Sequence, residues 1–238
     1  MKMRVLAIVA VIALLFCTGC SRQTEPDPEV EAFLNTGISA EKAYESVTKV
    51  EYTVHQSQQN KAGEETGGYD LHVKIDKSNP DALYLEYEQK LFGDAIEDGV
   101  SVKGATIALV DGKYIYTTVN GEQTKQQEAE EQFVKDYITS FFYKNNGAYN
   151  EGGLYYGDFF MLYIYKYPES SFSVDKENAQ CVFNEKMNIA YEQTGNVRLH
   201  QIAKINAYGL LNSNYERYES VDQDMVLVSE LKASYSFG

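Results

Sequence analysis

The chain has 238 residues and a formal net charge of −14, with 20 tyrosines, 11 phenylalanines and no tryptophan. A surface this acidic repels nucleic acid and anionic membrane headgroups, so nonspecific binding to either is not expected. The length allows one domain with a sizeable core, and the tyrosine content suits a β-rich protein with broad amphipathic surfaces.

The first twenty residues have the pattern of a secretory signal. Lys2 and Arg4 precede an apolar run over residues 5–16, which is shorter than the roughly twenty residues that a spanning helix needs. The run ends in Cys17-Thr18-Gly19-Cys20, which resembles the bacterial lipobox. The resemblance implies a lipoprotein signal peptide over residues 1–19, removed before Cys20, and lipidation of the Cys20 sulfur. We therefore expect an extracytoplasmic protein anchored by lipid to the bacterial cell membrane.

The segment after the lipobox is polar and carries Pro26 and Pro28, so residues 20–37 are expected to form a flexible tether. The remainder, residues 38–238, is expected to fold as a single domain. Ser39 is a candidate N-cap for a short helix over residues 39–49, because its hydroxyl can accept from a backbone N–H of the first turn.

Alternation of apolar and polar residues predicts antiparallel strands through the first half of this domain. Strands are expected over residues 50–58, 69–76 and 82–89. The clearest is 69–76, in which Tyr69, Leu71, Val73 and Ile75 share one face.

Two turn signals follow. Asp111-Gly112 predicts a type I′ hairpin that places Leu109 across from Tyr114 and Ile107 across from Tyr116. Asn120-Gly121 predicts a second turn of the same kind.

A helix is expected over residues 126–146, and its apolar stripe consists of Phe133, Val134, Tyr137, Ile138, Phe141 and Phe142. A glycine-rich segment over 147–157 leads into residues 159–167, which are apolar on every side. Periodicity does not decide whether that tract is a buried helix or a buried strand.

The last third of the chain predicts a meander of strands over residues 179–185, 187–193, 197–208, 215–221 and 225–237. Cys181 lies in the first of these strands, where we expect it to be buried as a small hydrophobic residue. The order of elements indicates an α+β fold with one large antiparallel sheet.

Three stretches resemble a known family: a lead helix running into a strand (SVTKVEYTVHQSQ), a strand–proline–strand pair (YDLHVKIDKSNPDALYLEYEQ) and an Asp-Gly-Lys hairpin (LVDGKYIYTTVNGEQT). Together they resemble the lipoprotein-carrier superfamily of LolA/LppX/LprG-type proteins. The resemblance implies a strongly curved antiparallel sheet, a half-open barrel, with helices covering its concave face and a cavity that holds acyl chains.

No motif indicates catalysis, a cofactor or a metal. His55, His72 and His200 fall on separate predicted strands without the spacing of metal ligands. No GxSxG elbow occurs. We therefore expect no enzyme, no cofactor and no metal site.

The expected ligand site is the apolar face of the sheet together with its covering segments. Its candidate residues are Leu71, Val73, Leu85, Leu109, Tyr114, Tyr116, Phe141 and Phe160. A solid core made of the same residues remains the alternative. The expected function is a membrane-anchored, monomeric lipoprotein that binds a lipid or another hydrophobic ligand. The alternative is a non-enzymatic surface lipoprotein that meets a protein partner through its tyrosine-rich face.

Overall fold

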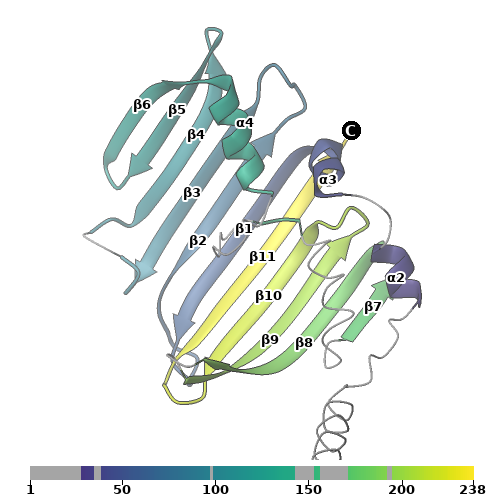
Figure 1. The fold of residues 1–238 in the computed structure, drawn as a ribbon. Coiled ribbons are helices and arrows are strands. Elements are labelled where there is room, and N and C mark those ends of the chain that lie inside the picture. Colours follow the sequence, from purple (N-terminus) through teal and green to yellow (C-terminus); the bar gives the residue numbers. More distant parts are fainter. Residues whose placement is uncertain (1–27, 35–38, 97–98, 143–152, 156–170, 192–194) are drawn as a thin grey trace, which may run out of the picture.

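One antiparallel sheet of eleven strands forms the body of the molecule (Figure 1). The computed structural model of the chain describes residues 28–34, 39–96, 99–142, 153–155, 171–191 and 195–238. The described helices are α2 (Pro28–Leu34), α3 (Ala40–Ser46) and α4 (Glu131–Ser140). The strands are β1 (Val47–Gln59), β2 (Glu65–Asp76), β3 (Tyr84–Gly93), β4 (Val102–Val110), β5 (Lys113–Asn120), β6 (Gln123–Ala129), β7 (Ser171–Asp175), β8 (Gln180–Tyr191), β9 (Gly195–Asn206), β10 (Leu211–Ser220) and β11 (Val226–Phe237).

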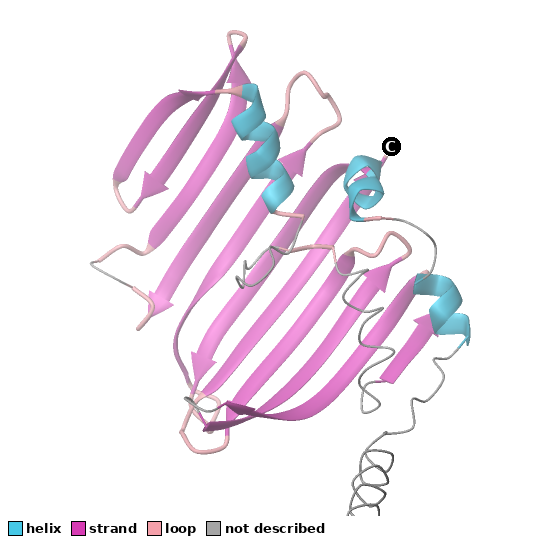
Figure 2. Ribbon diagram, viewed as in Figure 1, coloured by secondary structure: helices cyan, strands magenta, loops and turns pink. Residues whose placement is uncertain are grey.

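The sheet consists of two meanders that meet in its middle. The strand order is β6-β5-β4-β3-β2-β1-β11-β10-β9-β8-β7. The first and last strands pair with each other, from Val47 opposite Phe237 to Gln59 opposite Val226. The fold therefore has an amino-terminal half, β1–β6, and a carboxy-terminal half, β7–β11, joined by a pair of strands from the two ends of the domain (Figure 2). The predicted single large antiparallel sheet is confirmed.

The expected half-open barrel is wrong. The sheet is neither closed nor strongly curled (Figure 1). A barrel requires the two edge strands to approach each other. Here the edges are β6 and β7, at opposite ends of the eleven-strand order. The helices are also short: α4 lies across the strands of the amino-terminal half, while α3 lies at one end of the central strands (Figure 2).

Strand β2 confirms the clearest sequence prediction. Tyr69, Leu71, Val73 and Ile75 are all buried, whereas Asp70 between them is exposed. Side chains of a strand alternate between its two faces, so this pattern assigns one face of the sheet to the core. The opposite face carries the polar residues that alternate with them along the strand.

Short-range signals at the start of the domain are also confirmed. Ser39 is the N-cap of α3, with its hydroxyl accepting from the Lys42 backbone N–H at 3.3 Å. The helix ends earlier than predicted, at Ser46, because β1 already begins at Val47 and pairs with β11. Pro28–Leu34, part of the expected tether, forms α2, in which Val30 is buried beside β7 and β8.

The Asp-Gly hairpin has the predicted register. Asp111 and Gly112 both have positive φ, 50° and 79°, as a type I′ turn requires. Leu109 pairs with Tyr114 and Ile107 pairs with Tyr116.

At the next turn the prediction is wrong by one residue, because Asn120 belongs to β5 and pairs with Gln123. Gly121 then opens the loop with a φ of 60°.

The helix expected over residues 126–146 begins later than predicted. Gln126–Ala129 belongs instead to edge strand β6, which pairs with β5, and α4 starts at Glu131. The Gln, Lys and Glu residues of β6 favour a helix when considered alone. Strand β5 provides backbone hydrogen-bond partners that override this preference. Residues 143–146 lie outside the described part of the chain.

The carboxy-terminal meander differs from the prediction in two strands. Most of the two predicted segments 179–185 and 187–193 forms one strand, β8, whose pairing with β9 is unbroken from Gln180 to Tyr191. Strand β7 was not predicted, since its five residues are too short to show a clear alternation. Cys181 is fully buried in β8 as expected, and burial raises the pKa of its thiol to about 12.

Candidate functional site

The pairing register brings six of the predicted site residues to one face of the sheet. In an antiparallel pair, directly opposed residues point to the same face. Val73 is two residues from Leu71 on β2, and Ile75 on that same face lies opposite Leu85. Leu85 in turn pairs with Ile107, and Ile107 pairs with Tyr116. We call this face, which also holds Leu109 and Tyr114, the covered face; the face of Asp70 and His72 is the polar face.

Burial differs along the covered face. Leu71, Val73, Leu85 and Tyr114 are buried, and Tyr116 and Phe141 are half-buried. Leu109 is 40% exposed, because it lies at the hairpin end of β4. Phe160 and the tract 159–167 lie outside the described residues, as does Cys20.

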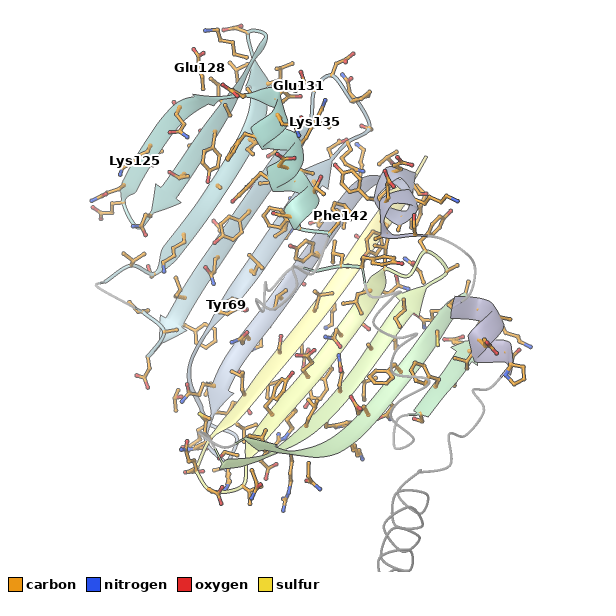
Figure 3. All side chains as sticks on the ribbon, viewed as in Figure 1. Tyr69, Lys125, Glu128, Glu131, Lys135 and Phe142 are labelled. Atoms are coloured by element: carbon orange, nitrogen blue, oxygen red, sulfur yellow. The ribbon has the colours of Figure 1, made fainter. Side chains whose placement is uncertain are left out.

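Helix α4 closes the covered face over the amino-terminal half. Val134 and Ile138, one turn apart, are fully buried, as are Leu85 and Ile107 on the strands. Such complete burial indicates a filled core directly under this helix, as the solid-core alternative expects. Figure 3 shows charged side chains, including Lys125, Glu128, Glu131 and Lys135, toward the outer edge, and Phe142 at the inner end of α4.

The end of α4 nearest the centre of the sheet contacts α3 and the segment that leads to β10. The Phe142 ring meets the Tyr44 ring of α3 edge to face at 5.0 Å between centroids. The Phe142 carbonyl accepts from the Tyr155 backbone N–H at 3.0 Å, and the Leu154 carbonyl accepts from the Leu211 N–H at 2.9 Å. These contacts link the cover of the amino-terminal half to the start of β10.

An aromatic ladder runs along α4 above the sheet. Phe133 stacks on Tyr137 at 5.6 Å, and Tyr137 meets Phe141 at 5.5 Å. From the sheet, Tyr116 contacts Phe133 and Tyr137 at 5.4 and 5.7 Å, while Tyr87 contacts Phe141 at 6.4 Å. Aromatic pairs at these separations stabilise beyond their buried area. The predicted residues Tyr116 and Phe141 are therefore joined in one cluster.

The centre of the covered face contains a polar atom that the sequence did not single out. Tyr52 lies on β1, in line with Val73 of β2 and Ala233 of β11, and is 1% exposed. Its hydroxyl is buried and has no hydrogen-bond partner among the described residues. Burial raises the pKa of Tyr52 far above its ordinary value, and the nearby Tyr137 and Tyr87 add to this. Tyr52 is thus a neutral phenol at the middle of an apolar surface.

Neighbouring phenols on the covered face are satisfied, which sets Tyr52 apart. The Tyr114 hydroxyl accepts from the Leu83 backbone N–H at 3.1 Å. The Tyr235 hydroxyl donates to the Leu211 carbonyl, and that of Tyr69 donates to Gln56 at 2.7 Å. A buried polar group without a partner costs about 1–3 kcal/mol.

In the carboxy-terminal half the covered face combines buried apolar residues, such as Phe183 and Ala203, with a polar network. Across the strands, Val54 of β1 aligns with Leu231 of β11, and Leu231 with Asn214 of β10. Gln201 donates through Nε2 to Asn214 Oδ1 and to Glu216 Oε1, both at 3.0 Å. The Asn214 amide donates to the same carboxylate oxygen at 2.8 Å. Sequence alternation did not predict this network, because polar residues in a strand are interpreted as solvent-facing.

The three histidines lie on separate strands, as predicted, and all three are on the polar face. His55 pairs across strands with Asp70, His72 with Thr53, and His200 with Lys186 and Arg217. Within the described residues, no group of three or more His, Cys, Asp or Glu side chains is arranged to hold a metal ion. The same part of the chain contains no helix long and apolar enough to cross a membrane.

Comparison with known proteins yields structural matches only. No protein-family model matches the chain, and neither does any curated protein. LprF from Mycobacterium bovis aligns with 90% of this chain and 95% of its own, at 9% identity and a TM-score of 0.39. A DUF1329 family protein from Desulfovibrio piger aligns with 90% of this chain and 94% of its own, at 9% identity and a TM-score of 0.28.

A domain from Vibrio parahaemolyticus, named as an outer membrane lipoprotein-sorting protein, aligns with 83% of this chain and 88% of its own, at 12% identity and a TM-score of 0.23. These three solved structures each align with more than four fifths of the chain, at 9–12% identity. These TM-scores describe a remote likeness of overall layout.

Proposed function

We propose that the chain is an extracytoplasmic lipoprotein that binds an amphipathic acyl ligand against the covered face of its sheet. The ligand has a long apolar part and an oxygen-bearing group such as a carboxyl or ester. Leu71, Val73 and Tyr87 provide the apolar surface beside the core that α4 fills, and Phe141 flanks it from the end of α4. Cys20 carries the lipid that anchors the protein to the membrane.

The observation that carries this proposal is the Tyr52 hydroxyl. It is a buried hydrogen-bonding group without a described partner, set among apolar and aromatic residues. Ligand sites for apolar molecules typically combine such a surface with a few polar groups that fix orientation. An ester or carboxyl oxygen accepting from Tyr52 would satisfy the phenol and position the ligand on the sheet.

The tyrosine distribution favours this function over the protein-partner alternative. Among the tyrosines whose burial the structure describes, each is buried or half-buried. They also lie on both faces: Tyr84 and Tyr215 are on the polar face, while Tyr52 and Tyr87 are on the covered face. The described tyrosines therefore form no single exposed docking face.

The test is native mass spectrometry of the full chain purified in mild detergent, with organic extraction of whatever remains bound. Wild type should carry an acyl molecule. Tyr52→Phe should reduce its retention about five- to tenfold, the equivalent of one hydrogen bond. Once bound ligand has been removed from both proteins, the same variant should unfold at the same or a slightly higher temperature, because it removes an unsatisfied buried group.

Tyr114→Phe is the matched control. Its hydroxyl accepts from a backbone N–H, so the variant should lose about 1 kcal/mol of stability while retaining ligand. An empty wild-type protein would contradict the proposal. So would a Tyr52→Phe variant that loses stability but retains ligand as wild type does.

Anchoring is tested separately through Cys20. Cys20→Ala should abolish fatty-acid labelling and move the protein from the membrane fraction to the soluble fraction. A variant that still labels and still sediments with membrane would show that the lipobox assignment is wrong.

A further inference from the structure

A basic cluster lies on the polar face of the carboxy-terminal half. Lys186 of β8, His200 of β9 and Arg217 of β10 stand directly opposite one another on adjacent strands. Arg198, two residues before His200, lies in the next row on the same face. These side chains line a recess of about 290 Å³ together with Asn188, Leu199 and Glu219.

The charge in this recess is not balanced. Glu219 is its single carboxylate, and it meets Arg217 at 3.2 Å and Arg198 at 3.7 Å. None of the described carboxylates lies within ion-pair distance of Lys186. Three cationic side chains and one histidine thus face one carboxylate, in a chain whose formal net charge is −14.

A positive charge on the middle member of this row would be unfavourable. Lys186 and Arg217 flank His200 on the two neighbouring strands, and like charges directly opposite each other across strands are destabilising. The middle member of the row, His200, has a buried Nε2 without a hydrogen-bond partner among the described residues. Burial lowers the pKa of His200, and the positive charges of Lys186 and Arg217 lower it further. An anion in the recess would offset the positive charge that Lys186, Arg198 and Arg217 bring together there.

The geometry suits a phosphate group. Guanidinium groups match phosphate oxygens with two parallel donors, and an ammonium adds a further donor. Arg198 is 64% exposed, so it can reach a ligand arriving from solvent. Opposing charges farther away on this acidic protein are screened beyond about 8–10 Å at physiological ionic strength.

We propose that Lys186, Arg198, His200 and Arg217 form a binding site for a phosphate group, borne either by an anionic lipid headgroup or by free phosphate. The site lies on the face opposite Tyr52 and does not depend on the acyl-binding function.

The test is isothermal titration calorimetry on the full chain in a neutral detergent, with two probes. One probe is inorganic phosphate, and the other is glycerophosphoglycerol, the deacylated headgroup of phosphatidylglycerol. Neither has an acyl chain, so the covered face does not contribute. Wild type should bind at least one of them in a saturable manner. The probe that binds more tightly shows whether the site takes a lipid headgroup or free phosphate. Lys186→Gln/Arg198→Gln should weaken that binding about tenfold or more.

Lys90→Gln/Lys113→Gln is the control. It removes the same charge from exposed positions in the amino-terminal half and should leave binding within twofold of wild type. Absence of saturable binding of both probes would overturn the proposal. Equal weakening in the two double variants would also overturn it, because binding would then follow net charge and not this cluster.

Discussion

His55 on β1 and His200 on β9 lie on the same face of one sheet, yet their surroundings are opposite. His55 Nδ1 lies 2.7 Å from Asp70 Oδ1, and its Nε2 lies 3.3 Å from Glu65. The hydrogen bond to Asp70, followed by that to Glu65, raises the pKa of His55 despite partial burial. His200 instead stands between Lys186 and Arg217, and its pKa is lowered. Local charge on this sheet is therefore set by cross-strand neighbours and not by the net charge of −14.

The covered face shows a second contrast between the same two halves. Under α4, the amino-terminal half is closed by fully buried Leu85, Ile107 and Ile138. In the carboxy-terminal half, Gln201 and Asn214 are also buried, at 5% and 9% exposed, and they are joined by a hydrogen bond. An apolar core is stabilised in proportion to the apolar area it buries. A buried polar network stabilises the fold only when each of its polar groups is hydrogen-bonded. The two halves should therefore respond differently to the same substitution.

The largest effect is expected for a charge placed on the covered face. Leu71→Asp buries an unpaired carboxylate at a site that is 6% exposed, at a cost comparable with the whole stability of a domain. Circular dichroism during heating should show no cooperative transition. Thr53→Asp places the same charge on the exposed polar face of β1, opposite His72 and Lys232, and should unfold like wild type. Equal behaviour of the two variants would refute the assignment of faces.

A smaller effect should separate the two halves. Gln201→Leu removes the donor to Asn214 and Glu216 and should lower the free energy of unfolding by about 1–3 kcal/mol. The same change at half-buried Gln89, on β3 of the amino-terminal half, removes one acceptor for the Tyr87 hydroxyl and should cost less than about 1 kcal/mol. Chemical denaturation measures both. A larger loss at Gln89 would mean that the polar network does not stabilise the carboxy-terminal half.

The smallest effect is the titration of the two histidines. Ring-proton NMR should give His55 a pKa above the ordinary value of 6.5 and His200 a pKa below it. The stability that His55 contributes is then complete below pH 6.5 and lost as pH rises through its folded pKa. For His200 the loss occurs as pH falls from 6.5 through its folded pKa, because the unfolded chain binds the proton more tightly. Equal pKa values for His55 and His200 would contradict the difference between their charge surroundings.

The sequence was most informative where structure depends on neighbours in the chain. Alternation along β2 assigned its faces, and Asp111-Gly112 fixed both a turn and the pairing of Leu109 with Tyr114. It was least informative about contacts between distant strands. The central pairing of β1 with β11 joins residues at the two ends of the domain, and no local pattern reports it.

The site shows the same limit. Alternation could place Leu71, Val73 and Leu85 on one face, because apolar residues at every second position need a core. It could not reveal that the Tyr52 hydroxyl is left unsatisfied, since that depends on what surrounds it in three dimensions. The basic cluster was hidden for a related reason. Lys186, Arg198 and Arg217 are far apart in sequence, within a strongly acidic chain.

Photo-crosslinking with a fatty acid that carries a diazirine on its acyl chain tests the central claim most directly. The full chain is irradiated with the probe, digested and mapped by mass spectrometry. The account predicts crosslinks on covered-face residues of β1, β2 and β3, around Tyr52, Val73 and Tyr87, that disappear when unlabelled fatty acid is in excess. Crosslinks confined to the polar face, or crosslinks that excess fatty acid does not displace, would contradict an acyl-binding site on the covered face.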